Sequence, residues 1–155
     1  MEISCTVIGN VEQRDGCRIV LQAPYKHGLK GLAGFGHVQV VWFADQVGNA
    51  GSAFTVMPKP YAKGPEQIGV FATRSPYRPN SLCISTAQIV DVDEERGILQ
   101  LGYIDAEDGT AVLDIKPYHG SEDRVREYKT PLWCAHWPQW LEDSEHFTWE
   151  EEFLF

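Results

Sequence analysis

The chain has 155 residues, of which 43% are hydrophobic and 23% are charged, and its formal net charge is −9. This length suits one domain with one main core, and this composition excludes disorder of the whole chain. No apolar run is long enough to cross a bilayer, and the first residues lack the basic and apolar regions of a signal peptide. We therefore expect a soluble protein that stays in the cytoplasm.

Short runs of β-branched and aromatic residues, bounded by turn residues, dominate the first three-quarters of the chain. In chain order they cover residues 4–8, 18–22, 37–43, 67–72, 84–92, 98–104 and 111–115. Residues 93–97 contain a glycine and join two of these runs into a predicted hairpin. This spacing favours a closed or sandwiched antiparallel sheet over βαβ units, so we predict an all-β, barrel-like fold.

Two segments between these runs are irregular. Residues 28–35 could form one short helical turn, although their glycines weaken it. Residues 44–66 are rich in glycine and proline and have no clear periodicity, which predicts a long loop of the kind that is often functional or mobile.

A tail rich in tryptophan and acid follows the barrel region, which we assign to residues 1–130. Residues 131–155 hold four of the five tryptophans, namely Trp133, Trp137, Trp140 and Trp149. The spacing of the first three would place them on one face of a helix. We expect this aromatic tail to dock on the barrel or on a partner subunit, with a cap over the site as the alternative.

The charge of the chain is unevenly distributed, which bears on nucleic-acid binding. Residues 142–155 contain six acidic residues and no Lys or Arg. Between residues 58 and 78 the sign reverses, because four cations face one acid, Glu66; the cations are Lys59, Lys63, Arg74 and Arg78. Phosphate binding rests on Lys and Arg, so a local basic patch is the candidate contact for a nucleic acid.

The first chemically dense stretch is residues 69–81, where an apolar run enters a turn with two arginines, two prolines and an asparagine. Proline fixes its own backbone and restricts the residue before it, so this turn is stiff. Arginine presents five donors in a rigid fork that suits a carboxylate or a phosphate. We predict a binding loop that uses Arg74 and Asn80. For Arg78 alone, a solvated arginine in a proline-stabilised turn is an equal alternative.

The second dense stretch is residues 105–118, in which Asp108-Gly109 is a hairpin turn signal. Asp114 and Lys116 alternate with apolar residues, so on a strand both charges point to the same face. The pair is either a surface salt bridge of little energetic worth or the lining of a polar cavity.

Other catalytic templates are missing from the sequence. It has no GxGxxG after a strand, no P-loop, no GxSxG and no HExxH. The histidines lack metal-ligand spacing, and the four cysteines are scattered without a CxxC pair. We therefore predict neither a metal site nor a disulfide framework, and we interpret Cys83 as a packed thiol.

Together, the two dense stretches and a glycine-rich segment resemble the TsaA-like, or TrmO, family of S-adenosylmethionine-dependent methyltransferases. The resembling motifs are GLAGFGH at 31–37, GVFATRS at 69–75, RPN at 78–80 and DGTAVLDIKPY at 108–118. They occur in the order of the family and cover roughly residues 4–118. The resemblance implies a single-sheeted antiparallel β-barrel, usually a homodimer; here it would carry short helical insertions and the Trp-rich tail.

The resemblance also implies an activity, namely methyl transfer from S-adenosylmethionine to N6 of a threonylcarbamoyl-modified adenosine beside the tRNA anticodon. Matching positions place the cofactor near Asp45, Gln46, Arg74, Ile84, Gly102, Tyr103, Ile104 and Asp105. The residues expected to act on the cofactor or the acceptor are Arg74, Asn80, Asp114, Lys116 and Tyr118.

Two other functions remain open from the residues. The chain carries Glu12-Gln13-Arg14-Asp15 where family members have a Pro-Arg-Gln type segment, and its overall charge is acidic. One rival is a methyltransferase of the same fold that acts on a small metabolite. The other is a sensor that binds S-adenosylmethionine without turnover and signals to a partner through the aromatic tail.

Overall fold

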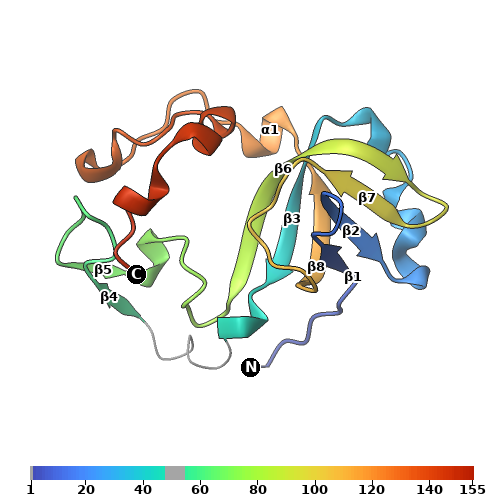
Figure 1. Cartoon of the computed structure of the whole chain (residues 1–155), viewed down its shortest axis with the longest axis horizontal. Coiled ribbons are helices and arrows are strands. Elements are labelled where there is room, and N and C mark those ends of the chain that lie inside the picture. Colours follow the sequence, from blue (N-terminus) through green and yellow to red (C-terminus); the bar gives the residue numbers. More distant parts are fainter. Residues whose placement is uncertain (1, 48–54) are drawn as a thin grey trace.

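The computed structural model describes residues 2–47 and 55–155 and contains a closed barrel of six strands (Figure 1). These strands are β1 (Gly9–Glu12), β2 (Cys17–Leu21), β3 (His37–Phe43), β6 (Leu82–Asp93), β7 (Ile98–Leu101) and β8 (Ala111–Pro117). They pair in the order β1-β2-β7-β6-β3-β8, and antiparallel pairing of β1 with β8 closes the ring. The predicted all-β, single-sheeted antiparallel barrel is confirmed.

The barrel forms because its strands alternate apolar and polar residues with the period of a pleated sheet. In β3, Val38 and Val40 are fully buried, whereas Gln39 between them is only partly buried. Ile19 of β2 and Leu99 of β7 are fully buried in the same core. Burial of these side chains supplies the hydrophobic free energy that holds the strands together.

The remaining elements are short. A separate two-stranded antiparallel sheet consists of β4 (Val56–Pro58) and β5 (Gln67–Gly69). The helical turns are η1 (Ala23–Leu29), η2 (Leu32–Gly34), η4 (Val70–Ala72), α1 (Gly120–Asp123), η5 (Leu132–Cys134), η6 (Leu141–His146) and η7 (Trp149–Glu151). None of the helices in the described ranges has the length and apolar character of a membrane span.

Several sequence predictions differ from the structure in their boundaries. Residues 4–8 are not a strand, and β1 starts at Gly9, where a Cβ would lie 2.5 Å from the Val20 carbonyl oxygen. The predicted run 98–104 ends as a strand at Leu101. The predicted run 67–72 ends as a strand at Gly69 and continues as η4. The predicted loop 44–66 includes β4, and its residues 48–54 lie outside the described residues.

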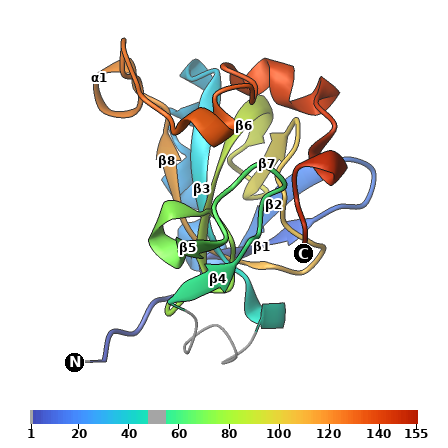
Figure 2. The same ribbon diagram turned by 90° about the vertical axis from the view of Figure 1, so that its left-hand side faces the viewer.

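A second hydrophobic cluster lies outside the barrel core. Met57, Tyr61 and Ile68 from the β4–β5 region pack against Trp133 and Trp137 of the tail. Figures 1 and 2 both show the tail running beside β4 and β5, away from the far strands of the barrel. An isolated antiparallel β-bridge between Tyr61 and Phe153 also joins the β4–β5 region to the tail.

The tail consists of 3-10 turns rather than one helix, so the tryptophans do not all share a face. The rings of Trp133 and Trp137 are 5.4 Å apart, and Trp149 lies 5.3 Å from Trp137. Trp140, which a helix would have placed beside them, is 63% exposed. The docking partner of the aromatic side is thus the β4–β5 region.

Candidate functional site

The arginine-bearing turn is a stiff loop, residues 73–81, that connects η4 to β6. Its polar side chains Thr73 and Ser75 are buried, and the Thr73 hydroxyl donates to the Val70 carbonyl at 2.8 Å. Arg78 Nη1 donates to the backbone carbonyls of Thr73 at 3.2 Å and Ser75 at 3.4 Å. Arg78 therefore braces its own loop, which restricts what else it can bind.

Arg74 differs from the other cations of the predicted basic patch. Lys59 Nζ lies 2.9 Å from the Glu66 carboxylate, and Lys63 Nζ lies 3.6 Å from that of Glu152. The Arg74 side chain is exposed and forms no hydrogen bond or ion pair with other described residues. Two of the four cations are thus neutralised by neighbours, while the Arg74 guanidinium is available to an anion.

The acidic loop, residues 102–110, joins β7 to β8 and is anchored by apolar residues. Ile104 and Ala106 are 1% and 8% exposed. Gln13 fixes the same loop, because its Nε2 donates to the Ala106 carbonyl at 2.7 Å and its backbone N–H donates to Asp108 Oδ1 at 2.9 Å. The sequence carried no signal for this role, since Gln13 acts over a separation of more than ninety residues.

Tyr103 and Asp105 project from this loop into solvent. Tyr103 is 68% exposed, and its hydroxyl lies 3.5 Å from Asp105 Oδ1. Partial burial and the negative charge and hydrogen bonding of Asp105 raise the Tyr103 pKa. A phenol that stays protonated beside a carboxylate leaves one negative charge at this point, on Asp105.

The arginine loop and the acidic loop meet at Cys83 on β6. Burial raises the pKa of the Cys83 thiol, Arg78 and Arg74 lower it, and Asp105 raises it again. The charges of Arg74, Arg78 and Asp105 thus all act on the same thiol. We call Arg74, Arg78, Cys83, Tyr103 and Asp105 the Cys83 cluster. Within it the two predicted stretches face each other.

The turn after β3 reaches the same acidic loop. Gln46 Nε2 donates to a Glu107 carboxylate oxygen, and the Ala44 backbone N–H donates to the Ser81 carbonyl at 2.9 Å. The residues predicted near the cofactor at positions 45, 46, 74 and 102–105 therefore belong to three segments, of which the turn after β3 is joined to the acidic loop by a side-chain contact and to the arginine loop by a backbone hydrogen bond. Ile84 is 48% exposed and, by strand alternation, points to the opposite face of β6 from Cys83.

The remaining predicted residues are not part of the Cys83 cluster. Asn80 is exposed in the arginine loop. Asp114 and Lys116 form an ion pair of 2.7 Å on β8, with both side chains about half exposed or more, as the alternation predicted. Tyr118 hydrogen-bonds to His37 at the start of β3, whereas the arginine loop enters β6 opposite Phe43 at its end. The length of β3 separates these ends by about 20 Å.

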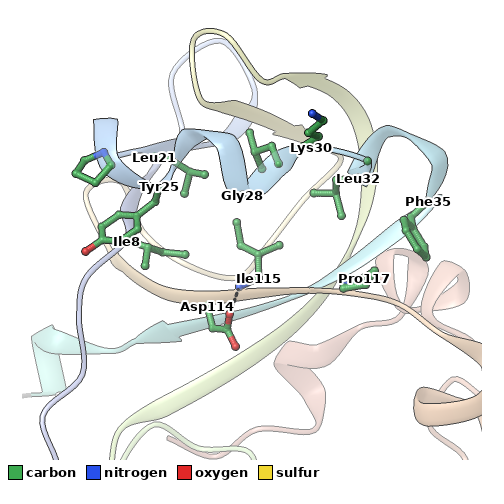
Figure 3. Close-up of a pocket in the computed structure, with 13 residues that line it drawn as sticks. Ile8, Leu21, Tyr25, Gly28, Lys30, Leu32, Phe35, Asp114, Ile115 and Pro117 are labelled. Atoms are coloured by element: carbon green, nitrogen blue, oxygen red, sulfur yellow. Dashed lines mark hydrogen bonds between the residues drawn. The ribbon is translucent and has the colours of Figure 1, made fainter.

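Asp114 also lines a cavity of about 570 Å³ between η1, η2 and β8 (Figure 3). Its other walls are mainly apolar, with Ile8, Leu21, Leu32 and Ile115 facing one another across it. No member of the Cys83 cluster contributes to this cavity. Among the residues that the structure describes, no three His, Cys, Asp or Glu side chains gather as metal ligands would.

Comparison with known proteins identifies close relatives of the barrel region. The family model for the tRNA-methyltransferase O N-terminal domain matches residues 7–124. A tRNA (adenine(37)-N6)-methyltransferase of Escherichia coli is 39% identical over 114 residues, which are 71% of this chain and 48% of that protein. The human protein of the same name is 38% identical over 107 residues, which are 69% of this chain and 23% of that protein. The chain thus spans half or less of the length of these relatives.

Two further matches concern ligand and structure. A probable S-adenosyl-L-methionine-binding protein of Archaeoglobus fulgidus is 34% identical over 105 residues, covering 68% of this chain and 27% of that protein. A crystal structure of TrmO superposes with a TM-score of 0.69 at 28% identity, covering 84% of this chain and 64% of that chain. A crystal structure of TrmO from Pseudomonas aeruginosa superposes with a TM-score of 0.66 at 26% identity, covering 85% of this chain and 63% of that chain. The whole aromatic tail, residues 131–155, lies beyond the family match.

Proposed function

Because the chain belongs to the family of tRNA-methyltransferase O N-terminal domains, we propose that it is an S-adenosylmethionine-dependent methyltransferase. We propose as its acceptor N6 of a threonylcarbamoyl-modified adenosine beside the tRNA anticodon. The observations that support the proposal are that the charges of Arg74 and Asp105 both act on the Cys83 thiol and that Gln46 bonds to Glu107, which relates the two dense stretches 69–81 and 105–118 to the turn after β3.

The residues present fit the chemical groups of S-adenosylmethionine. The exposed Arg74 guanidinium suits the carboxylate of its methionine part. The Asp105 carboxylate suits its cationic groups, and the exposed Tyr103 ring offers an aromatic face for a cation or a base. The backbone of residues 102–105, fixed by Ile104, and the side chains of Asp45 and Gln46 would complete the cofactor contacts.

When bound, the cofactor supplies an electrophilic methyl group on a sulfonium, so the protein contributes position and electrostatics rather than a nucleophile. Arg74 and Asp105 would hold the two charged ends of the ligand in a fixed orientation. Asn80, exposed on the same loop as Arg74, would orient cofactor or acceptor. The adenine amine must lose a proton during or after attack, and water can accept it without a dedicated base.

We assign Asp114, Lys116 and Tyr118 to contacts with the acceptor rather than the cofactor. All three lie on β8 or directly after it, outside the Cys83 cluster, and the Asp114–Lys116 pair is accessible to a large substrate. A tRNA would also meet a smaller positive surface than the sequence indicated, since Lys59 and Lys63 are paired with acids.

The decisive experiment is calorimetric titration of S-adenosylmethionine into the wild type and the Arg74→Ala variant. Loss of a charge-assisted contact should weaken binding about tenfold or more. Arg74 is exposed, so the melting temperature should not change. Lys59→Ala, which removes a cation paired with Glu66, is the matched control and should bind like the wild type. Equal affinity of Arg74→Ala and the wild type would remove Arg74 from the site.

The acceptor is tested separately with methyl-labelled S-adenosylmethionine. Transfer of label to tRNA that carries threonylcarbamoyl-adenosine supports the proposed acceptor. The net charge of −9 favours a second candidate, a small metabolite, which label transfer to a metabolite panel but not to tRNA would support. Tight binding without transfer to any acceptor would support the sensor function, in line with the name of the archaeal relative.

We further propose that the protein acts in the cytoplasm as a homodimer. Phe43, Leu82 and Ile84 are 37%, 42% and 48% exposed, and the register places Phe43 directly opposite Leu82. Adjacent exposed apolar side chains on a barrel wall are typical of an interface. Light scattering after size exclusion should give twice the chain mass, and Leu82→Glu should halve it; a monomeric wild type would contradict this.

A further inference from the structure

The tail encloses one aromatic side chain of the preceding region, Tyr61. The Tyr61 ring stacks on Trp133, with centroids 4.9 Å apart and an interplanar angle of 18°. Trp137 meets the same ring edge-on at 5.4 Å, and Phe153 lies 5.9 Å away. Tyr61 is consequently only 6% exposed. Three aromatic contacts fix the position and plane of this ring.

A buried carboxylate fastens the tail to the segment that carries Tyr61. Glu152 is 5% exposed, and its oxygens lie 2.5 Å from His136 Nε2, 3.1 Å from Trp137 Nε1 and 3.6 Å from Lys63 Nζ. The Ala62 backbone N–H, next to Tyr61, donates to the Glu152 carbonyl at 2.9 Å. Both the side chain and the backbone of Glu152 thus tie the tail to residues 61–63.

The other side of Tyr61 faces the arginine loop. Burial raises the Tyr61 pKa, while hydrogen bonding from the Thr73 side chain and the Arg74 backbone lowers it. Ile68 packs in the same cluster as Tyr61 and lies on β5, from which η4 leads directly into Thr73. The Tyr61 ring is therefore packed against the tail, and it is linked to the start of the arginine loop through Ile68 and η4.

We propose that the aromatic tail holds the Arg74 loop in its ligand-binding position, with Tyr61 as the positioning residue between them. The inference rests on the proposed function, in which Arg74 binds S-adenosylmethionine. A loop held in its bound conformation loses less entropy on binding, so its support raises affinity without touching the ligand. The tail lies wholly outside the matched residues 7–124, so the support comes from sequence beyond the shared domain.

The test uses Tyr61→Phe in the full chain, which keeps the ring and removes the hydroxyl whose pKa Thr73 and Arg74 lower. Amide hydrogen exchange should become faster in residues 73–80 and stay unchanged in the barrel strands. Affinity for S-adenosylmethionine should fall about two- to tenfold, the range expected for one hydrogen bond, with an unchanged melting temperature. Tyr128→Phe, which removes another tyrosine hydroxyl bonded to Gln139, is the control and should change neither property.

Trp133→Leu tests the tail side of the same connection, because it removes the ring stacked on Tyr61. It should accelerate exchange in residues 73–80 as Tyr61→Phe does. Unchanged loop exchange in both variants would overturn the inference, and so would faster exchange with unchanged affinity. If the wild type itself fails to bind S-adenosylmethionine while both variants accelerate loop exchange, the proposed function fails and the positioning role stands.

Discussion

Replacing Trp137 by alanine should undo the docking of the tail. The Trp137 ring lies 5.3–5.4 Å from the rings of Tyr61, Trp133 and Trp149, and its indole N–H donates to Glu152 at 3.1 Å. Truncation of a buried aromatic residue to alanine costs about 3–5 kcal/mol. Since Trp137 is only partly buried, we expect the lower end, about 3 kcal/mol.

Trp140→Ala provides a matched control three residues away. The Trp140 side chain is 63% exposed, and within the described ranges its ring contacts no other aromatic ring. Truncation of such a surface side chain should change the free energy of unfolding by less than about 0.5 kcal/mol. The two variants remove the same atoms from the same tail and differ in the packing of the ring and in the Trp137 hydrogen bond to Glu152.

The assay is thermal unfolding observed by two signals. Four of the five tryptophans lie in the tail, so fluorescence reports mainly on the tail, whereas far-ultraviolet circular dichroism reports on the barrel. A loss of about 3 kcal/mol should lower the fluorescence midpoint by about 6–12 °C in a chain of this size. Equal midpoints for Trp137→Ala and Trp140→Ala would refute the assigned packing of the tail.

Three other variants test separate contacts. Hydrogen bonds from His136 and Trp137 lower the pKa of Glu152 from its ordinary value of 4.5. Glu152 therefore stabilises the docked tail fully at a pH above 4.5, and this stabilisation is lost as the pH falls below it. In Glu152→Gln the fluorescence midpoint should no longer show this decrease at acid pH. Gly97→Ala should cost about 1–3 kcal/mol in chemical denaturation, because Gly97 has a φ of +70° and its Cβ would lie 2.8 Å from the Lys26 Cβ; Gly28→Ala, with open space around it, should be neutral. Arg78→Ala removes the donor to two carbonyls of its loop and should speed amide exchange there but not in the barrel.

Much of the barrel could be predicted because its strands carry strong local patterns. Residues 37–43 were predicted as a strand and form β3 with the same bounds, since apolar residues alternate there across a half-buried sheet. β4 was missed because it has only three residues, ends at a proline and derives its stability from pairing with β5. Short strands of this kind depend on distant partners that a local pattern does not contain.

The candidate site likewise contains some features that the sequence predicted and others that it did not. Strand alternation predicted that Asp114 and Lys116 share a face, and their ion pair confirms this. That Asp105 approaches the arginine loop, whereas Tyr118 lies at the other end of β3, depends on the strand order of the closed barrel. Strand order is set by long-range pairing, which local periodicity does not encode.

The arginine loop is one of the covalent links between the two hydrophobic clusters, and this has a thermodynamic consequence. It begins beside Tyr61 in the tail cluster and ends where the Ala44 N–H bonds to the Ser81 carbonyl at the barrel. A ligand that binds Arg74 on this loop and Asp105 on the barrel would stabilise only the arrangement in which both clusters are folded and adjacent. Linkage then requires that the ligand raise the fluorescence and circular dichroism midpoints together and bring them closer. A ligand held by the barrel alone would raise the second midpoint and leave the first unchanged, so the two signals distinguish a site shared by both loops from one confined to the barrel.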